Sequence, residues 1–564
     1  MMLQICNGNF LFTNKTYKTT HRTPLYTNLV IPEEGIDFCI GKILPTSMFL
    51  SPKVLICEIE ERQPAENPDG SSSVLIATTG QDLMDDFSYV LSFYFGGLCT
   101  TSYSFAKQLL NSEKITGNTP RNFIHQFFDE SIVITNSQAF EFQSFFSKLV
   151  NSPREFYEKA IQAIRRYVTA AIRISDDLDA AYTLFVASIE SLAQDANDSE
   201  VSWNDVDPRK RKGLDVILNN LDKQTADSIR SEIISHEHLA LSRKFLTTAM
   251  NSLNGNFYNP EGKNYKIAGK NQLKIAIKNA YNLRSKYVHI LKPLPSEISN
   301  PYNLNYCINV DGKPNLTFNG LSAVNKEVIV KYVTEMPHCN KESLDTMKFM
   351  PGIAYAQMSE IYWMHDVKFL RKENYLLLFE AVIARIENAI FTLKPEIPDM
   401  KLMVNEIGEQ LSHENNKDNI LILMATLMLL AHFYGFTLDK KYEKTIKKHE
   451  NIYNSKGIVM LLVNTLCLQK LDNITEYHLS FEDYVEKKYQ KGRIKLSEFF
   501  ESLVCANLIN HFIESDNIDT AESLLEYIEL NTPNSPIKTK DRLRNKNNKF
   551  DIFNYINTSK KPII

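Results

Sequence analysis

One short segment of this chain combines a permanent positive charge with a side chain that exchanges protons near neutral pH. Residues 279–291 place Arg284 and His289 five positions apart, in an R-x4-H arrangement. An arginine guanidinium stays charged at every relevant pH and can hold a phosphate through two parallel hydrogen bonds. A histidine imidazole can act as a general acid or base. Together these two residue types could cleave RNA without a metal ion.

The spacing of the pair has little specificity by itself. A similar pair, Arg230 and His236, lies in a predicted helix whose polar neighbours indicate an exposed face. On a straight helix, residues five apart differ in direction by about 140°, so Arg284 and His289 do not share a face. The length of arginine, a loosened last turn before Pro293, or a second chain could bring them together. A symmetric dimer is the most economical arrangement, because it places two copies of each residue in one cleft.

Predicted helices surround this pair. Apolar residues recur at helical spacing along residues 155–174, which indicates one buried face. Three further helices are predicted over residues 176–194, 222–253 and 271–291. Pro293 and Pro295 end the last of them. With another helix over residues 322–335, we expect residues 151–335 to form a compact helical bundle.

The chain has 564 residues, which is too many for one hydrophobic core and predicts a multidomain α+β protein. We expect residues 1–150 to form a β-rich domain with a helical connector, because short runs of β-branched residues alternate there with turn residues. These runs lie at residues 28–31, 38–40, 54–59 and 74–77.

The second half of the chain predicts helices almost throughout. We expect a helical array over residues 336–535, in which two antiparallel helices joined at residues 515–517 resemble one tetratricopeptide repeat. Residues 536–564 are rich in lysine and arginine and predict an exposed basic tail. The apolar run at residues 420–433 is too short to span a bilayer, so we expect a buried helix there. With no signal-peptide pattern at the N-terminus, we expect a cytoplasmic protein without a membrane partner.

Charge and cysteine usage restrict the possible sites. The formal net charge is -4, so any nucleic-acid site must be a local basic patch. The candidate contacts to an RNA backbone are Lys286 and the run Arg209, Lys210, Arg211 and Lys212. Such a run is also typical of an exposed loop. The eight cysteines are scattered singly, which favours a reduced interior over a zinc site or a disulfide scaffold.

Other motifs point away from metals and cofactors. His236 and His238 are two residues apart, so on a helix they face different directions and do not form a metal site. The acidic residues Asp82, Asp85 and Asp86 have no nearby base or glycine-rich loop and indicate a helix start. The chain has no P-loop, dinucleotide fingerprint or G-x-S-x-G motif. We therefore expect neither a metal nor a cofactor.

Two predicted helices resemble the HEPN superfamily, and most closely its Apea-like branch, which occurs in bacterial antiviral proteins. The similar segments are residues 182–192 and 280–289, and residues 316–329 are similar to the segment that closes that domain. In the family a late helix carries Arg-Ser-x-x-x-His after an aromatic-x-Leu lead, and an earlier helix carries a glutamate in an apolar frame, which is Glu190 in this chain. The resemblance covers residues 153–335, about a third of the chain.

This resemblance implies a metal-independent endoribonuclease. In that chemistry the ribose 2′-hydroxyl attacks its own adjacent phosphate, leaving a cyclic phosphate and a 5′-hydroxyl. His289 would be the general acid or base, and Arg284 would stabilise charge on the pentacoordinate phosphate. Glu190 would orient the pair or neutralise Arg284 at rest. The supporting polar residues are Asn282 and Ser285, and many active members carry Asn or Asp where this chain has Ser285.

The leading hypothesis is therefore a homodimeric HEPN ribonuclease that acts on RNA as an antiviral, abortive-infection effector. The N-terminal and C-terminal domains would sense a phage-derived or host protein trigger, or would restrain the nuclease. One alternative is a non-catalytic HEPN scaffold that dimerises and binds a protein partner. Another is a toxin held inactive by a separate antitoxin chain.

Overall fold

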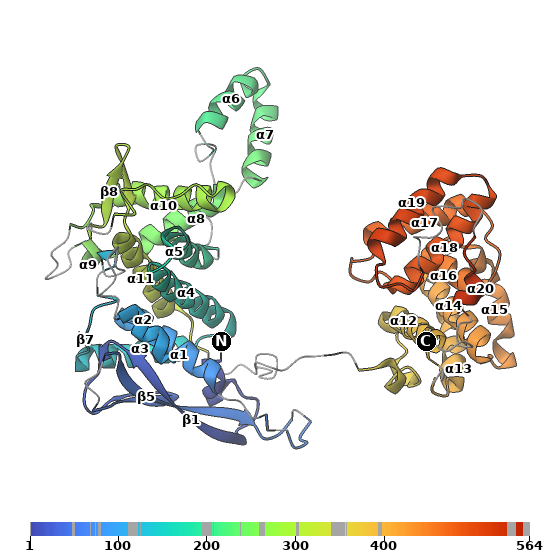
Figure 1. The fold of residues 1–564 in the computed structure, drawn as a ribbon, viewed down its shortest axis with the longest axis horizontal. Helices are drawn as coiled ribbons and strands as arrows, with labels where there is room; N and C mark the ends of the chain where they lie inside the picture. Colours follow the sequence, from blue (N-terminus) through green and yellow to red (C-terminus); the bar gives the residue numbers. More distant parts are fainter. Residues whose placement is uncertain are drawn as a thin grey trace. The chain divides into compact units, whose positions relative to one another are not determined.

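The computed structural model divides the chain into two compact units, residues 1–354 and 355–564, each with its own hydrophobic core. The fold is mixed α+β, with a small sheet near the N-terminus and a helical C-terminal region (Figure 1). The structure describes all residues except 1, 48–50, 68, 74, 77–79, 111–121, 125, 195–202, 204–205, 207, 237–238, 259–265, 301–303, 340–355, 357, 393–396, 538–548 and 557–564.

A five-stranded sheet with strand order β3-β4-β5-β1-β6 begins the first unit. Its strands are β1 (Thr16–Thr27), β3 (Ile36–Phe38), β4 (Gly41–Pro45), β5 (Lys53–Pro64) and β6 (Cys99–Thr100). The long strands β1 and β5 pair antiparallel along their whole length, from Thr16 opposite Pro64 to Thr27 opposite Lys53. Along β5 buried residues alternate with half-buried ones, as expected for a strand with one covered face.

The predicted strands agree with this sheet only in part. Three predicted runs coincide with or overlap β5, β3 and the short β2 (Leu29–Val30), which pairs with β7 (Ile132–Val133). The strand predicted at residues 74–77 is wrong for Leu75 and Ile76, which lie outside any strand, and its other two residues are outside the described part. β1 was not predicted, because its threonines and charged residues contain few apolar side chains to mark it.

Three helices accompany the sheet, so this part of the chain is less β-rich than expected. They are α1 (Gln81–Phe95), α2 (Tyr103–Leu110) and α3 (Asn136–Val150). The predicted helix start at the acidic cluster is confirmed, because α1 begins at Gln81. It ends at Gly96, whose φ of +67° is a left-handed conformation that glycine adopts without steric cost.

Five helices pack together as a bundle in the rest of the first unit. They are α4 (Arg154–Arg173), α5 (Leu178–Ala193), α8 (Leu239–Ser252), α10 (Lys270–Ile290) and α11 (Phe318–Glu335). The single helix predicted over residues 222–253 covers α7 (Lys223–His236) and α8, and residues 237–238 between them are outside the described part. The predicted closing helix begins earlier than expected, because Thr317 caps α11 through its side chain.

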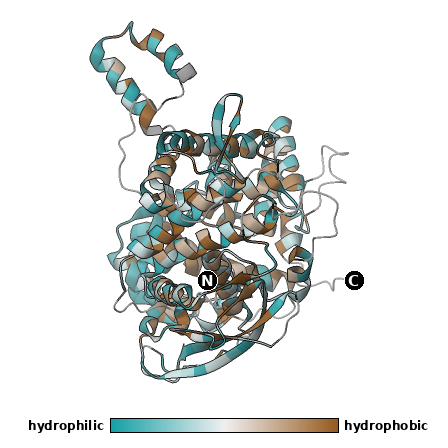
Figure 2. Cartoon of the chain, turned by 90° about the vertical axis from the view of Figure 1, so that its left-hand side faces the viewer, coloured by the Kyte–Doolittle hydropathy of each residue, from teal (hydrophilic) through white to brown (hydrophobic). Residues whose placement is uncertain are grey.

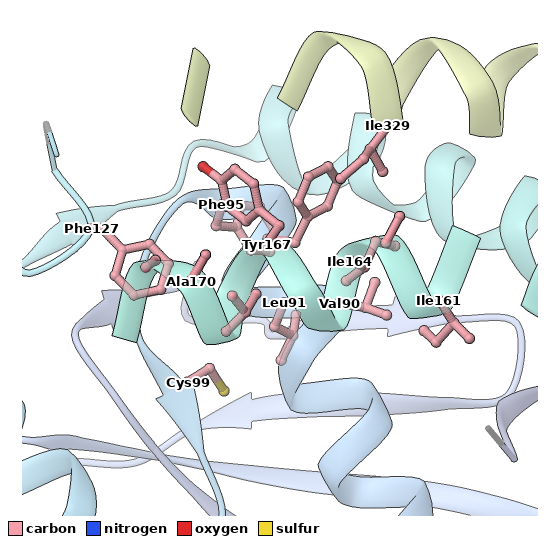
Figure 3. Packing of buried hydrophobic residues seen from close by; sticks show 14 of the residues in the cluster. Val90, Leu91, Phe95, Cys99, Phe127, Ile161, Ile164, Tyr167, Ala170 and Ile329 are labelled. Atoms are coloured by element: carbon pink, nitrogen blue, oxygen red, sulfur yellow. The ribbon is translucent and has the colours of Figure 1, made fainter. Parts of the chain in front are cut away.

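The predicted boundary between residues 150 and 151 falls inside one hydrophobic core. Figure 3 shows α4 crossing this core, with Ile164 and Tyr167 lying beside Val90 and Leu91 of α1. Ile329 of α11 belongs to the same cluster. Buried residues of α4 face both the sheet-bearing part and α5, so the two predicted domains fold as one unit.

A pair of helices, α6 (Pro208–Leu218) and α7, stands apart from the bundle (Figures 1 and 2). The basic run at residues 209–212 lies in the first turns of α6, so the expectation of a loop is wrong. Hydropathy colouring shows the bundle helices with both hydrophobic and hydrophilic residues, as amphipathic helices require (Figure 2).

The second unit is helical. Its helices are α12 (Tyr375–Phe391), α13 (Lys401–His413), α14 (Lys417–Tyr434), α15 (Glu443–His449), α16 (Ile458–Leu466), α17 (Ile474–Lys487), α18 (Glu498–Glu514), α19 (Ile518–Asn531) and α20 (Ile552–Ile556). The predicted helix pair is confirmed as α18 and α19, which pack together around the turn at residues 515–517. Between residues 336 and 374 the described residues form only short 3-10 turns, so the first helix in the described part of the array begins at Tyr375. Most of the predicted basic tail lies outside the described residues.

Among the described residues, α14 is the one helix long and apolar enough to cross a membrane by length and composition. It has 18 residues, more than the apolar run suggested. Its side chains Leu423, Met424, Leu429 and Leu430 are buried in the core of the second unit. The prediction of a buried helix is confirmed for these positions.

Candidate functional site on helix α10

The helix that carries Arg284 and His289 forms where its sequence predicted it. α10 runs from Lys270 to Ile290, one residue earlier at each end than predicted. Its buried side chains Leu273, Ala276, Ile277 and Ala280 recur at helical spacing and face the bundle. The first two-thirds of α10 are therefore anchored by apolar packing, and its last turns are largely exposed.

Arg284 forms an ion pair with Glu190 of α5. Its Nη2 lies 2.8 Å from Oε2 of Glu190, and the two side chains are only 23% and 14% exposed. The Nε of Arg284 is buried without a hydrogen-bond partner. Tyr281 lies beside the pair: burial and then the negative charge of Glu190 raise the pKa of its phenol, whereas Arg284 lowers it. Arg284 and Glu190 therefore place opposite charges in contact between α10 and α5.

His289 lies on a different side of α10. It is exposed, as are its neighbours Val288, Ile290 and Leu291. Since α10 is a regular helix up to Ile290, the direction difference of about 140° between Arg284 and His289 remains. One chain therefore does not bring the guanidinium and the imidazole together.

The supporting residues Asn282 and Ser285 both lie nearer to the direction of His289 than to that of Arg284. Asn282 precedes His289 by seven residues, so the two differ in direction by only roughly 20°. Both are exposed, as is Lys286, while Ser285 is half-buried. Tyr287 packs towards the first turn of α5, where burial and then Asp177 and Asp179 raise its pKa.

The basic run at residues 209–212 is not part of this arrangement. It belongs to α6, where Lys210 and Lys212 are exposed, Arg211 is half-buried and the side chain of Arg209 is outside the described part. No packing of α6 against α10 is among the main helix contacts of the described chain. The structure therefore gives this run no place beside His289.

In the second arginine–histidine pair, Arg230 and His236, the arginine has a structural role. Arg230 is only 24% exposed and pairs with Asp227 at 3.0 Å and Asp215 at 3.5 Å. Its guanidinium lies 5.6 Å from the ring centre of Trp203. The expectation of an exposed face is therefore wrong for Arg230, which joins α6 to α7. The side chain of His236 is outside the described part.

A polar cleft of about 600 Å³ lies beside α10. Its other walls are the hairpin of β8 (Cys307–Val310) with β9 (Lys313–Leu316), and the segment that follows α10. The hairpin turns at Asp311 and Gly312, which both have positive φ, as a two-residue type I′ turn requires. Asn282, Lys286, Lys292 and Lys313 line the cleft. Lys292 and Lys313 were not predicted, because their proximity depends on how the hairpin packs on α10.

The end of α10 places an L-residue in a conformation that favours glycine. Leu291 has φ +51° and ψ +32°, and its N–H bonds the carbonyl of Tyr287 at 2.9 Å. Replacing Leu291 with glycine is expected to stabilise the protein by about 1 kcal/mol, because a left-handed L-residue costs about that much. Leu291 is 75% exposed, so little packing is lost.

Urea unfolding of the full chain, followed through the transition of residues 1–354, measures this effect. Leu291→Ala is the matched control, since alanine keeps the steric cost while removing the same side chain. A glycine variant no more stable than the alanine variant would contradict the prediction.

Comparison of the chain with protein-family models, with curated proteins and with solved structures gives no match. The chemistry of the site therefore rests on its own residues. These are a partly buried Arg284–Glu190 pair, an exposed histidine on the same helix, and a lysine-bearing cleft that the same helix lines in part.

Proposed function

We propose that this chain is a metal-independent endoribonuclease of the HEPN type. The observation that carries the proposal is the 2.8 Å contact between Arg284 and Glu190. This contact joins α10 to α5, the two helices that carry the HEPN resemblance. Arg284 and Glu190 are the charged residues that the resemblance places on these helices. Helix α10 also carries His289 in an exposed position, where substrate can reach it.

In the proposed reaction His289 acts as the general base or the general acid. The 2′-oxygen of a ribose forms a bond to the adjacent phosphorus, and the bond from phosphorus to the 5′-oxygen breaks. A base accepts the 2′-hydroxyl proton and an acid protonates the leaving 5′-oxygen, and the imidazole suits either step near neutral pH. Arg284 would stabilise the extra negative charge on the phosphate once it exchanges Glu190 for the substrate.

A second copy of the chain would complete this site. Arg284 and His289 of one chain point in different directions, so the arginine of one copy would act with the histidine of the other. The exposed apolar residues Val288, Ile290 and Leu291 lie next to His289 and offer a surface for such a contact. Light scattering of the purified chain tests this step, and a fully active monomer would contradict it.

We further propose that the nuclease serves antiviral defence in the cytoplasm by abortive infection. An RNase that is always active would poison its own cell, so a restraint is required. The Arg284–Glu190 pair provides one restraint inside the site. The second unit is a large helical body that could receive a phage-derived or host protein trigger.

RNA cleavage by the full chain in the presence of EDTA tests the proposal. Unstructured single-stranded RNA is incubated with the protein over a range of concentrations that includes those at which the dimer forms. We expect products with 2′,3′-cyclic phosphate and 5′-hydroxyl ends. Products with other ends would refute the mechanism, and no cleavage by the dimer or in infected cells would refute the nuclease.

A non-catalytic dimerisation scaffold is the second candidate. One observation favours it, namely that Arg284 is already neutralised by Glu190 and diverges from His289. The scaffold predicts a dimer that binds a protein partner and leaves RNA intact. The cleavage assay above, combined with light scattering, separates the two candidates.

A further inference from the structure

The cleft beside α10 receives one lysine from each of its three walls. Lys286 comes from α10, Lys292 from the segment that follows it, and Lys313 from β9. All three side chains belong to exposed residues. Positive charges at the end of α10 and on the hairpin surround an anionic ligand better than a row of lysines on one helix face.

The walls of the cleft are held in place by buried or half-buried hydrogen bonds. The side-chain amide of Asn279 in α10 donates to the carbonyl of Pro314 at 2.8 Å, which fastens the hairpin to the helix. The N–H of Leu294 donates to Oδ1 of Asp179 at 2.6 Å, which fastens the third wall to α5. Pro293 and Pro295 restrict the same segment further. The cleft is therefore largely formed before any ligand enters.

The charges of the cleft favour an anion. Glu297 and Asp311 also line it, so three lysines and two carboxylates leave one net positive charge on a chain whose total is -4. Glu297 accepts a hydrogen bond from the hydroxyl of Ser296 at 3.3 Å, and Asp311 lies in the hairpin turn. Within the described residues, neither carboxylate forms an ion pair with the three lysines, which leaves the ammonium groups available to phosphates.

His289 is not part of the cleft lining, but it lies about one helical turn beyond Lys286 on α10. Asn282 and Lys286 line the cleft from α10, and His289 follows Lys286 by three residues and shares the direction of Asn282 to within roughly 20°. A strand that leaves the cleft along α10 therefore passes the imidazole. Arg284 is absent from the lining and faces α5.

We infer that this cleft binds the backbone of single-stranded RNA next to the phosphodiester that is cut. Lys292 and Lys313 contact neighbouring phosphates, and the exposed amide of Asn282 reaches the ribose. The inference rests on the proposed function, because it gives the substrate a path to His289. A volume of about 600 Å³ is that of a pocket for a drug-sized ligand and takes unpaired nucleotides, not a duplex. Lysines hold phosphates as point charges, so the cleft imposes little sequence preference.

Binding is measured separately from cleavage in the full-length His289→Ala variant, which keeps the cleft. Fluorescence anisotropy of labelled single-stranded RNA is followed as a function of salt. In the Lys292→Gln/Lys313→Gln variant the slope of log K against log salt is expected to fall by about 1.4, since each phosphate contact on a single strand contributes about 0.7. At about 0.1 M salt, the loss of these two contacts is expected to make the variant bind RNA roughly 25-fold more weakly than its His289→Ala parent.

Lys270→Gln/Lys274→Gln is the matched control, because both lysines are exposed on α10 but lie outside the cleft. We expect this control to bind with an affinity within about twofold of the parent. With His289 intact, the cleft variant should raise KM and leave kcat nearly unchanged, as loss of uniform binding does.

The outcomes separate this inference from the proposed function. A cleft variant that binds and cuts RNA like the control overturns the inference and leaves the nuclease standing. Lysine-dependent binding without cleavage by the wild type overturns the nuclease and keeps the cleft as an RNA site. Equal affinity for a duplex of the same sequence overturns the assignment to single strands.

Discussion

Replacing His289 with alanine is expected to slow RNA cleavage by a factor of about 10² to 10⁴, the range typical of a lost general acid or base. His289 is exposed at the end of α10, so the substitution removes no buried packing and the fold should persist. The measurement is kcat/KM on single-stranded RNA with the full chain. His338→Ala, which removes another exposed histidine of the same unit, should retain an activity within about twofold of the wild type. Equal activities of the two variants would exclude His289 from the chemistry.

Mixing variants tests whether each site takes residues from two chains. His289→Ala chains keep Arg284, and Arg284→Ala chains keep His289, so each homodimer is inactive. In a mixed dimer one of the two composite sites regains both residues. Random exchange makes half of the dimers mixed, with one of two sites intact, so roughly a quarter of the wild-type activity should return. No recovery after exchange, verified by light scattering, would exclude the composite site.

Replacing Gly320 with alanine is expected to destabilise the first unit by about 3 kcal/mol, the upper end of the usual cost of overpacking. Gly320 lies in the first turn of α11, where it is buried. A Cβ added there would lie 2.1 Å from the carbonyl oxygen of Tyr306 and 2.8 Å from its carbonyl carbon. That oxygen already accepts a hydrogen bond from the N–H of Thr317 at 3.1 Å. Because the obstacle is backbone, no side-chain rotation relieves it.

Gly213→Ala provides the matched control for this prediction. Gly213 also lies inside a helix, α6, but an added Cβ there meets no atom within 4 Å. Alanine should therefore stabilise α6 by about 1 kcal/mol through helix propensity alone. Urea unfolding, followed through the transition of residues 1–354, measures both variants. A Gly320→Ala protein as stable as the control would contradict the prediction, because it would mean that the backbone of α11 or of residue 306 shifts at little energetic cost.

The sequence predicted the features that depend on neighbouring residues. The bounds of α10 agree with its apolar spacing and with Pro293, and α1 begins at the predicted acidic cluster. The divergence of Arg284 and His289 was also predictable, because it follows from the helical repeat alone. Where local signals were ambiguous the prediction was wrong, as for the strand expected at residues 74–77, since Leu75 and Ile76 lie outside any strand.

Only the tertiary structure decided which distant residues meet. The contact of Arg284 with Glu190 joins α10 to α5, and the cleft combines Lys286 with Lys313 of a hairpin later in the chain. The shared core of the sheet and the bundle depends likewise on α4 burying more than one face. Periodicity identifies a buried helix face without naming its partner, because apolar packing is not directional. The sequence therefore determined which residue types are available for chemistry, and the packing of α5, α10 and the β8–β9 hairpin determined which of them lie together.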